Sequence, residues 1–206
     1  IYHQRYSTNT FPEWWLAQTI RSLAHNGENN TIRGNKNWMK VHEIKMADNA
    51  FDEFSGDIKP VIPVGASDSA ALDAVFELLV HGGRDAPMVK TMLIPESWSK
   101  KSTMPEAWRD MYAFVNSVME PWDGPAAIAA TDGRWIVGGT DRNGLRPMRY
   151  TLTRDNLLIV GSETGMVVVP ETNVAERGRL GPGQMITVDL EKGGFFRDTE
   201  IKDRLA

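Results

Sequence analysis

The order of the expected elements is what most constrains the fold of this chain. Helix signals stand between residues 65 and 118, and short strands separated by turn residues dominate from Pro121 onward. Because the two kinds of element are grouped rather than strictly alternating, the pattern favours an α+β fold with mixed sheets and helices on their outer faces. The length of 206 residues suits one sizeable domain or a large piece of one.

The clearest helix is predicted over residues 68–80. Ser67 is the expected N-cap, and Gly82 with Gly83 provides the stop signal. Asp68 then falls in the first turn, where the helix dipole favours a carboxylate. The residues expected on its buried face are Leu72, Val75, Phe76 and Leu79.

A second helix is predicted to begin at Thr103. Glu106 stands three residues later, which is the spacing of a capping box. Residues 35–46 are assigned to a further helix, and residues 57–63 to a loop. The residues expected on the buried face of the second helix are Trp108, Met111, Tyr112, Val115 and Val118.

The last third of the chain is expected to be strands. The turn pair Asp132-Gly133 separates residues 125–130 from residues 135–137, which predicts a hairpin. Further strands are predicted at residues 157–160, 166–169 and 185–188. The stretch from Asp141 to Gly144 lacks the later oxygen ligands of a calcium loop, so a tight turn is expected, with Arg142 or Arg146 paired to nearby acids.

Composition excludes several classes of function. The net charge is −4 and basic residues form no stripe with aromatic ones, so no nucleic-acid partner is expected. No apolar run approaches the roughly 20 residues of a membrane span, and no signal peptide is visible. The sequence contains no cysteine and its four histidines lack the spacing of a zinc-protease helix, so no metal site is expected. A cytoplasmic location fits these features.

Two short polar segments near the start carry the chemistry. Asn26 followed by Gly27 offers a side-chain amide and an unobstructed backbone N–H, which together can stabilise an oxyanion. Arg5 offers a planar fork suited to a carboxylate, and Asp68 can hold an ammonium group. A ligand with a carboxylate, an ammonium and a reactive carbonyl describes an amino acid with a side-chain amide, of which glutamine is the obvious candidate.

Each of these assignments has a purely structural alternative. Asn-Gly is first of all a turn dipeptide. An arginine beside aromatic and hydroxyl residues is commonly a surface or bridging group. His25 is expected to brace the loop that presents Asn26, and His3 the strand that presents Arg5.

The order of the motifs resembles a known family. The motifs are residues 3–10, residues 25–28 with Asn30 and residues 34–35 after them, residues 67–69, residues 120–125 and residues 141–147. In this order they resemble the glutaminase domain, a class II glutamine amidotransferase, at the N-terminus of the large subunit of glutamate synthase. Other class II amidotransferases share the arginine, His-Asn-Gly and Ser-Asp motifs, whereas the segments around Trp38 and residues 120–146 are more specific.

The resemblance implies a fold and a set of roles. The family folds as a four-layer αββα sandwich of the N-terminal-nucleophile hydrolase type, with antiparallel-rich sheets and outer helices. Its nucleophile is an N-terminal cysteine whose own α-amine serves as the base. Carried onto this sequence, Arg5 binds the α-carboxylate of glutamine, Asp68 binds its α-ammonium, and Asn26 with Gly27 forms the oxyanion hole.

The chain starts at Ile1 and lacks that cysteine. We therefore expect residues 1–206 to be the C-terminal part of a single amidotransferase domain, inactive by itself. The resemblance further implies that the ammonia passes to a synthase domain of the same polypeptide, which uses 2-oxoglutarate, FMN, an iron–sulfur cluster and an electron-donating subunit. Two alternatives stay open: the glutaminase domain of an amidophosphoribosyltransferase, and a non-catalytic amino-acid-binding module.

Overall fold

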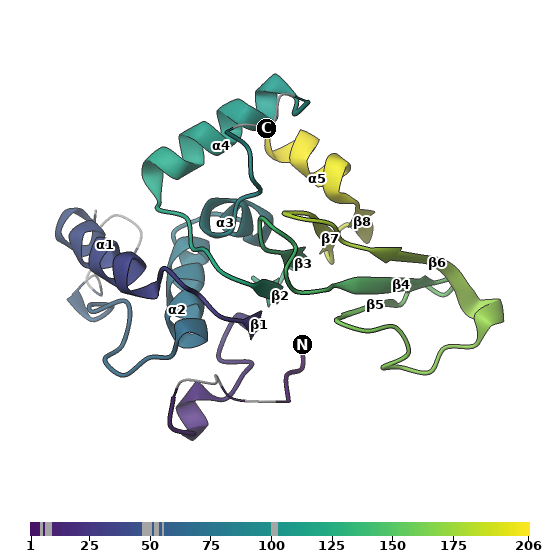
Figure 1. Ribbon diagram of the computed structural model, residues 1–206, viewed down its shortest axis with the longest axis horizontal. Coiled ribbons are helices and arrows are strands. Elements are labelled where there is room, and N and C mark those ends of the chain that lie inside the picture. Colours follow the sequence, from purple (N-terminus) through teal and green to yellow (C-terminus); the bar gives the residue numbers. More distant parts are fainter. Residues whose placement is uncertain (5, 7–9, 47–50, 52–53, 55, 100–102) are drawn as a thin grey trace.

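The computed structural model describes residues 1–4, 6, 10–46, 51, 54, 56–99 and 103–206. Helices occupy the first half of the described chain and strands most of the second half (Figure 1). The helical elements are η1 (Trp14–Leu16), α1 (Ile32–Lys45), α2 (Asp68–His81), α3 (Ala86–Leu93), α4 (Glu106–Val118), η4 (Glu171–Asn173) and α5 (Asp198–Leu205). The strands are β1 (Leu23–Gly27), β2 (Ala126–Thr131), β3 (Trp135–Thr140), β4 (Arg149–Thr153), β5 (Leu158–Gly161), β6 (Val174–Arg179), β7 (Met185–Asp189) and β8 (Gly194–Phe196).

The strands form two sheets. The larger sheet has the order β1-β2-β3-β7-β8 and the smaller one the order β5-β4-β6. Every pairing between described strands is antiparallel, so the expectation of mixed sheets is wrong, whereas that of antiparallel-rich sheets is confirmed. Hairpins connect β2 to β3, β4 to β5 and β7 to β8, whereas the other neighbouring strands are joined by longer segments of the chain.

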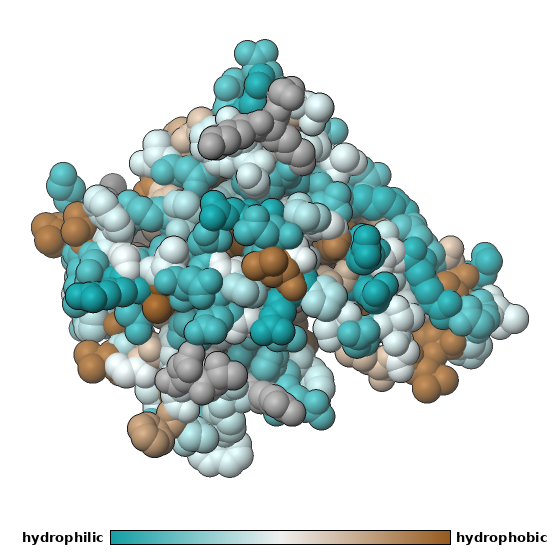
Figure 2. Space-filling model, viewed as in Figure 1, coloured by the Kyte–Doolittle hydropathy of each residue, from teal (hydrophilic) through white to brown (hydrophobic). Residues whose placement is uncertain are grey.

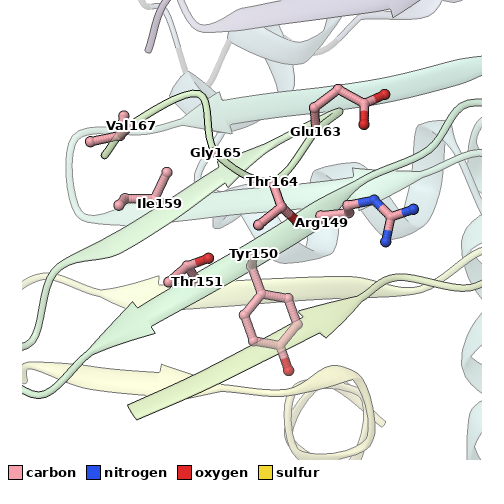
Figure 3. A pocket seen from close by; sticks show the side chains of 8 residues that line it. All are labelled: Arg149, Tyr150, Thr151, Ile159, Glu163, Thr164, Gly165 and Val167. Atoms are coloured by element: carbon pink, nitrogen blue, oxygen red, sulfur yellow. The ribbon is translucent and has the colours of Figure 1, made fainter. Parts of the chain in front are cut away.

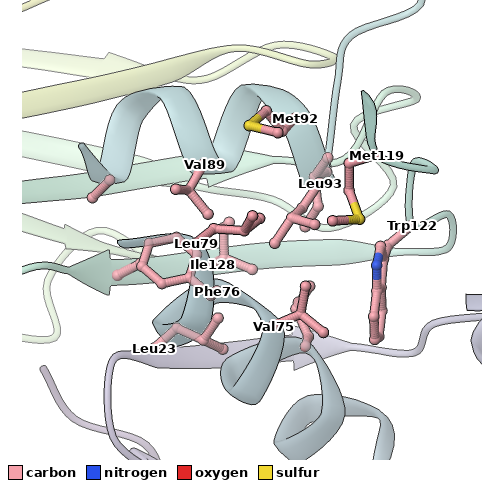
Figure 4. Packing of buried hydrophobic residues seen from close by; sticks show 14 of the residues in the cluster. Leu23, Val75, Phe76, Leu79, Val89, Met92, Leu93, Met119, Trp122 and Ile128 are labelled. Carbon is pink, nitrogen blue, oxygen red and sulfur yellow. The ribbon is translucent and has the colours of Figure 1, made fainter. Parts of the chain in front are cut away.

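The larger sheet packs against a different layer on each face. Leu23, Ile128 and Val137 point to one face and share a core with α2, α3 and α4. Figure 4 shows side chains of α2 and α3 directed at β1 and β2 in this core. Ala127 and Ile186 point to the opposite face and pack against residues of the smaller sheet. The described residues therefore supply a helix layer and two sheet layers of the expected four-layer sandwich.

Several apolar side chains of the described residues are exposed. On α1, Trp38 and Ile44 are exposed, and beyond β5 the run Met166–Val168 is exposed as well. Figure 2 shows apolar side chains at the end of the molecule that carries the smaller sheet. Among the described helices, none is both long and apolar enough to cross a membrane.

The prediction for α2 is confirmed at both ends. The Ser67 side chain accepts a hydrogen bond from the backbone N–H of Ala70, and Gly82 is the C-cap. The helix of residues 35–46 and the loop of residues 57–63 are confirmed too, although α1 begins earlier, at Ile32.

The predicted start of α4 is wrong by three residues. The helix begins at Glu106 with Pro105 as its N-cap, and the side chain at that cap makes no capping bond. The ring of a proline disfavours helical geometry at the residue before it, so Met104 cannot extend the helix back to Thr103. The capping box was therefore a false signal.

The predicted strand at residues 166–169 is also wrong. These residues form bends and irregular chain, and Val168 is 94% exposed. The run has strand propensity, but no described strand lies beside it to pair, and propensity without a partner does not form a sheet. The hairpin about Asp132-Gly133 and the strands near residues 158 and 185 are confirmed.

A buried charge network attaches α5 to the core. The ammonium of Lys202 contacts the carboxylates of Glu96 and Asp198, at 2.8 Å for Asp198, and its side chain is 1% exposed. The second carboxylate oxygen of Asp198 accepts a hydrogen bond from the backbone N–H of Met185 on β7, at 2.9 Å. Nearby, the Lys90 ammonium donates to the Gly183 carbonyl oxygen, and burial lowers the pKa of Lys90 to about 8.

Lys202→Met should destabilise the protein strongly. Removing one partner from a buried ion pair leaves uncompensated charge, which typically costs about 3–5 kcal/mol of the free energy of unfolding. Denaturant unfolding followed by tryptophan fluorescence measures the change. Lys192→Met is the matched control, because Lys192 is exposed and should move the free energy by no more than about 0.5 kcal/mol. Similar midpoints for the two variants would contradict this role of the network.

Candidate functional site

The Asn26-Gly27 pair ends strand β1 and is not a turn, so that structural alternative is wrong. Gly27 lies opposite Ala126 on β2. The next residue, Glu28, donates its backbone N–H to the Pro125 carbonyl oxygen at 2.9 Å. Hydrogen-bonded and non-bonded positions alternate along an antiparallel pair. The Gly27 N–H therefore faces away from β2, past the edge of the sheet.

The Asn26 side chain leaves the strand beside that N–H. Asn26 is exposed and lies opposite Ala127, whose side chain packs toward the smaller sheet. Opposed residues of an antiparallel pair share a face, so the Asn26 amide emerges on the side of the smaller sheet. A side-chain amide and a backbone N–H consequently lie next to each other at one strand end, and both are neutral donors.

Close packing at this strand end requires glycine. A Cβ added to Gly27 would lie 1.7 Å from the Pro125 carbonyl oxygen and 2.7 Å from Nε2 of His25. The opposing loop has the same requirement, since a Cβ on Gly124 would lie 1.9 Å from the Glu28 carbonyl oxygen. The two backbones approach so closely that no side chain fits between them.

The N-terminus of α2 reaches the same end of β1. The Asp68 carboxylate accepts a hydrogen bond from the backbone N–H of Asn29 at 3.0 Å. Its side chain is 16% exposed, so the carboxylate is partly accessible. Ser69, the next residue, places its hydroxyl oxygen 3.0 Å from Nδ1 of His25. Asp68 thus contacts Asn29, which follows Asn26 by three residues, and its carboxylate lies at the same strand end as Asn26.

Asp73, one turn further along α2, holds the other end of β1. One of its carboxylate oxygens accepts hydrogen bonds from the backbone N–H groups of Ser22 at 2.8 Å and Leu23 at 2.9 Å. The residue is fully buried, and burial raises the pKa of Asp73 above its usual value despite these bonds. Sequence reasoning missed Asp73. The available signal was a carboxylate inside the apolar stretch of α2, five residues after Asp68.

His25 is buried between β1 and α2. The sequence predicted that His25 braces a loop, but it lies within strand β1. Its contact with Ser69 nevertheless holds the segment that carries Asn26. Burial lowers the pKa of His25 below 6.5, and the neighbouring Asp68 carboxylate opposes that shift only in part. The imidazole is therefore neutral at pH 7.

The turn after β3 is confirmed as structural. The buried Asp141 carboxylate accepts hydrogen bonds from the backbone N–H groups of Asn143 within the turn and Ala126 at the start of β2, both at 2.9 Å. Arg142 pairs with Asp123, as the sequence predicted for this arginine. The turn thereby fixes the loop that lies against Gly27.

Arg5, the fourth predicted site residue, lies outside the described residues. The structure therefore brings together Asn26, Gly27 and Asp68, at the open edge of β1. An open hollow is lined by Thr10, Phe11, Glu13, Trp15, Leu16, Val64 and Gly65. Within the described chain, no group of three or more histidine, aspartate or glutamate residues is arranged to hold a metal ion.

A second hollow lies on the smaller sheet, away from this strand end. Figure 3 shows its lining, in which Arg149 and Thr151 of β4 face Ile159 of β5 and the loop that follows it. Its interior has room for about a single water molecule. None of the four predicted site residues lines it.

The comparisons with known proteins identify the family. The model for "Glutamine amidotransferases class-II" matches residues 1–206. The chain belongs to the class II glutamine amidotransferase family. The likeness extends over the whole chain, so it includes the strand end described above as well as the segment that contains Arg5.

Curated relatives are named glutamate synthases. The chain is 63% identical over its full length to the glutamate synthase [NADPH] large chain of Azospirillum brasilense, and 47% identical to ferredoxin-dependent glutamate synthase 2, chloroplastic, of Arabidopsis thaliana. It spans only 14% and 13% of those two proteins. Among solved structures, it resembles the glutamine phosphoribosylpyrophosphate amidotransferase of B. subtilis, with a TM-score of 0.46 and 18% identity over 85% of this chain and 28% of that one.

Gly27→Ala should disrupt this strand end. The added Cβ meets backbone rather than a flexible side chain, so the end of β1 must separate from Pro125. Overpacking of this kind typically costs about 1–3 kcal/mol of the free energy of unfolding, which denaturant titration measures. Gly34→Ala is the matched control: its Cβ meets nothing within 4 Å in α1, so the helix should gain up to about 1 kcal/mol. Equal effects of the two substitutions would contradict the close approach.

Proposed function

We propose that this chain binds glutamine and stabilises the oxyanion in the glutaminase domain of a glutamate synthase large subunit. The family match and the glutamate synthase relatives support the proposal. The observation that carries it is the Gly27 N–H turned away from β2, beside the Asn26 side chain and at the strand end where Asp68 lies. The reaction is hydrolysis of L-glutamine to glutamate and ammonia.

Each residue then has one task. Asp68 receives the α-ammonium of glutamine and Arg5 its α-carboxylate, which orients the side-chain amide toward β1. Asn26 and Gly27 donate to the amide oxygen as the carbon becomes tetrahedral. Donors that are already fixed in place stabilise developing charge without reorganisation during the reaction. For Arg5 the assignment rests on the sequence alone.

The nucleophile has to come from elsewhere in the polypeptide. The sequence has no cysteine, so we infer that the thiolate and its α-amine base belong to residues outside 1–206, and that this chain by itself does not hydrolyse glutamine. The thiol proton passes to the α-amine and then to the departing ammonia, and water hydrolyses the resulting thioester. On this view residues 1–206 are the C-terminal part of the amidotransferase domain.

We further propose that the ammonia remains inside the protein and reaches a synthase domain that converts 2-oxoglutarate into glutamate. Inside the protein, ammonia stays unprotonated and nucleophilic, whereas in water at neutral pH it is mostly ammonium. FMN, an iron–sulfur cluster and any electron-donating subunit belong to that part, because a cluster needs ligands such as cysteine that this sequence lacks. We place the enzyme in the cytoplasm, although some relatives are named chloroplastic.

Asn26→Ala in the intact enzyme should lower glutaminase turnover by about 10²–10³, because one oxyanion donor is lost. Glutamine binding should change little, since the ground-state carbonyl depends less on that donor. Steady-state kinetics and equilibrium glutamine binding measure the two effects. Asn37→Ala, on the exposed side of α1, is the matched control and should leave both unchanged. Turnover within a few-fold of normal would make Asn26 a structural residue. Glutamine binding without hydrolysis by the unmodified enzyme would favour the non-catalytic binding module.

Asp68→Asn should weaken glutamine use without unfolding the protein. Asparagine keeps an oxygen for the Asn29 N–H, but the ammonium loses a charge-assisted hydrogen bond worth roughly 1.5–3 kcal/mol. That loss corresponds to about 10–150-fold in kcat/KM for glutamine. Ammonia-dependent glutamate synthesis should be spared.

The control for Asp68→Asn is Asp85→Asn. Asp85 is also an aspartate at a helix start, and it caps α3 through the Met88 N–H. We expect that variant to retain normal glutamine kinetics and a normal melting temperature. Normal glutamine kinetics in a folded Asp68→Asn enzyme would make Asp68 a structural residue.

A further inference from the structure

We propose that His25 is a positioning residue for the oxyanion donors: as a neutral imidazole it connects Ser69 on α2 to Pro125 before β2, and so fixes the direction of the Gly27 N–H. The inference rests on the function proposed above. It assigns a task to a buried side chain that the hydrolysis itself does not use.

The geometry places the two ring nitrogens against different elements. Nδ1 lies 3.0 Å from the Ser69 hydroxyl oxygen and 3.8 Å from the Asp68 carboxylate. Nε2 is buried and has no partner of hydrogen-bond geometry within the described chain. The point where a Gly27 Cβ would stand is 2.7 Å from Nε2 and 1.7 Å from the Pro125 carbonyl oxygen, so both atoms border the space that glycine leaves open.

This arrangement selects one tautomer. The nearby acceptor for Nε2 is the Pro125 carbonyl oxygen, so we assign the proton to Nε2. Nδ1 then accepts from the Ser69 hydroxyl. Tautomers are inferred from hydrogen-bond partners rather than observed, and here each nitrogen has a neighbour of the matching type. The ring thus spans the distance from α2 to the loop that closes against Gly27.

Protonation would redirect the ring. With a second proton bound, Nδ1 could no longer accept a hydrogen bond from the Ser69 hydroxyl. Its N–H would face the Asp68 carboxylate, the group that we assign to the substrate ammonium. Burial of the ring, the charge of Arg146 after the β3 turn and that of His3 all disfavour the protonated form, whereas Asp68 and the Pro125 carbonyl favour it. Because the net effect lowers the pKa of His25, the neutral form should persist below pH 6.5 and fail only in more acidic solution.

Two isosteric substitutions separate the nitrogens. The amide nitrogen of glutamine reaches the position of Nε2, whereas the amide of asparagine reaches only that of Nδ1. In the intact enzyme, His25→Gln should keep kcat for glutamine within about threefold. His25→Asn should lower kcat by about 10–100-fold, less than outright loss of an oxyanion donor, with KM nearly unchanged. In the pH profile of kcat, the acidic limb of His25→Gln should be less steep than that of the unmodified enzyme, because only the α-amine base and not residue 25 then titrates there.

The outcomes distinguish this inference from the proposed function. If Asn26→Ala lowers turnover but both His25 variants keep normal kcat, the positioning role is wrong while the oxyanion hole stands. Equal loss of kcat in both variants with lowered melting temperatures would make His25 merely structural, and an unchanged acidic limb in His25→Gln would also overturn the proposal. Should neither variant fold, Ser69→Ala decides: it removes the Nδ1 partner, and an acidic limb identical to that of the unmodified enzyme would refute the link.

Discussion

The attachment of β1 to α2 is the interaction on which the rest of the site depends. β1 is an edge strand, so only one side of it is held by the sheet. Polar side chains of α2 hold the rest: Asp73 accepts from the backbone N–H groups at the start of the strand, Ser69 contacts His25 in its middle, and Asp68 accepts from Asn29 beyond its end. The outward N–H groups of Leu23 and His25 are bonded to the side chains of Asp73 and Gln18, which orders the strand. The Gly27 N–H, at the end of the strand, is the outward group that we assign to a ligand.

The loop before β2 supplies the opposing surface. Asp141 fixes that loop through the Ala126 N–H, and the Pro125 carbonyl accepts from Glu28 across the gap. The direction of the Gly27 N–H, one of the two proposed oxyanion donors, is therefore set by backbone geometry and buried hydrogen bonds, whereas the Asn26 amide is presented by an exposed side chain. Such rigidity is what electrostatic stabilisation of a transition state requires, because donors that must reorganise lose much of their effect.

Local signals predicted α2 well and the strand end only in part. The Ser67 cap and the apolar face of α2 follow from short patterns in the sequence and are confirmed. The roles of Asn26, Gly27 and Asp68 rest on equally short patterns and stay predictions, although the structure does bring the three residues to one strand end. Strand β1 itself was not predicted, because its five residues show no alternation and its order comes from α2, which lies more than 40 residues later in the chain. The same reason explains Asp73: its partners are distant backbone groups. The run at residues 166–169 failed in the opposite way, with strand propensity but no partner.

The two aspartates of α2 divide structure from function by their exposure. Asp73 is fully buried and holds the backbone at the start of β1, a position where a charge is costly and accessibility is useless. The Asp68 side chain is 16% exposed, and its carboxylate accepts a hydrogen bond from the Asn29 N–H. A partly exposed carboxylate can exchange water for an ammonium ligand, and the strand remains held by Asp73 while it does so. On the proposed function, substrate charge can thus be bound and released without disturbing the oxyanion donors on the same strand.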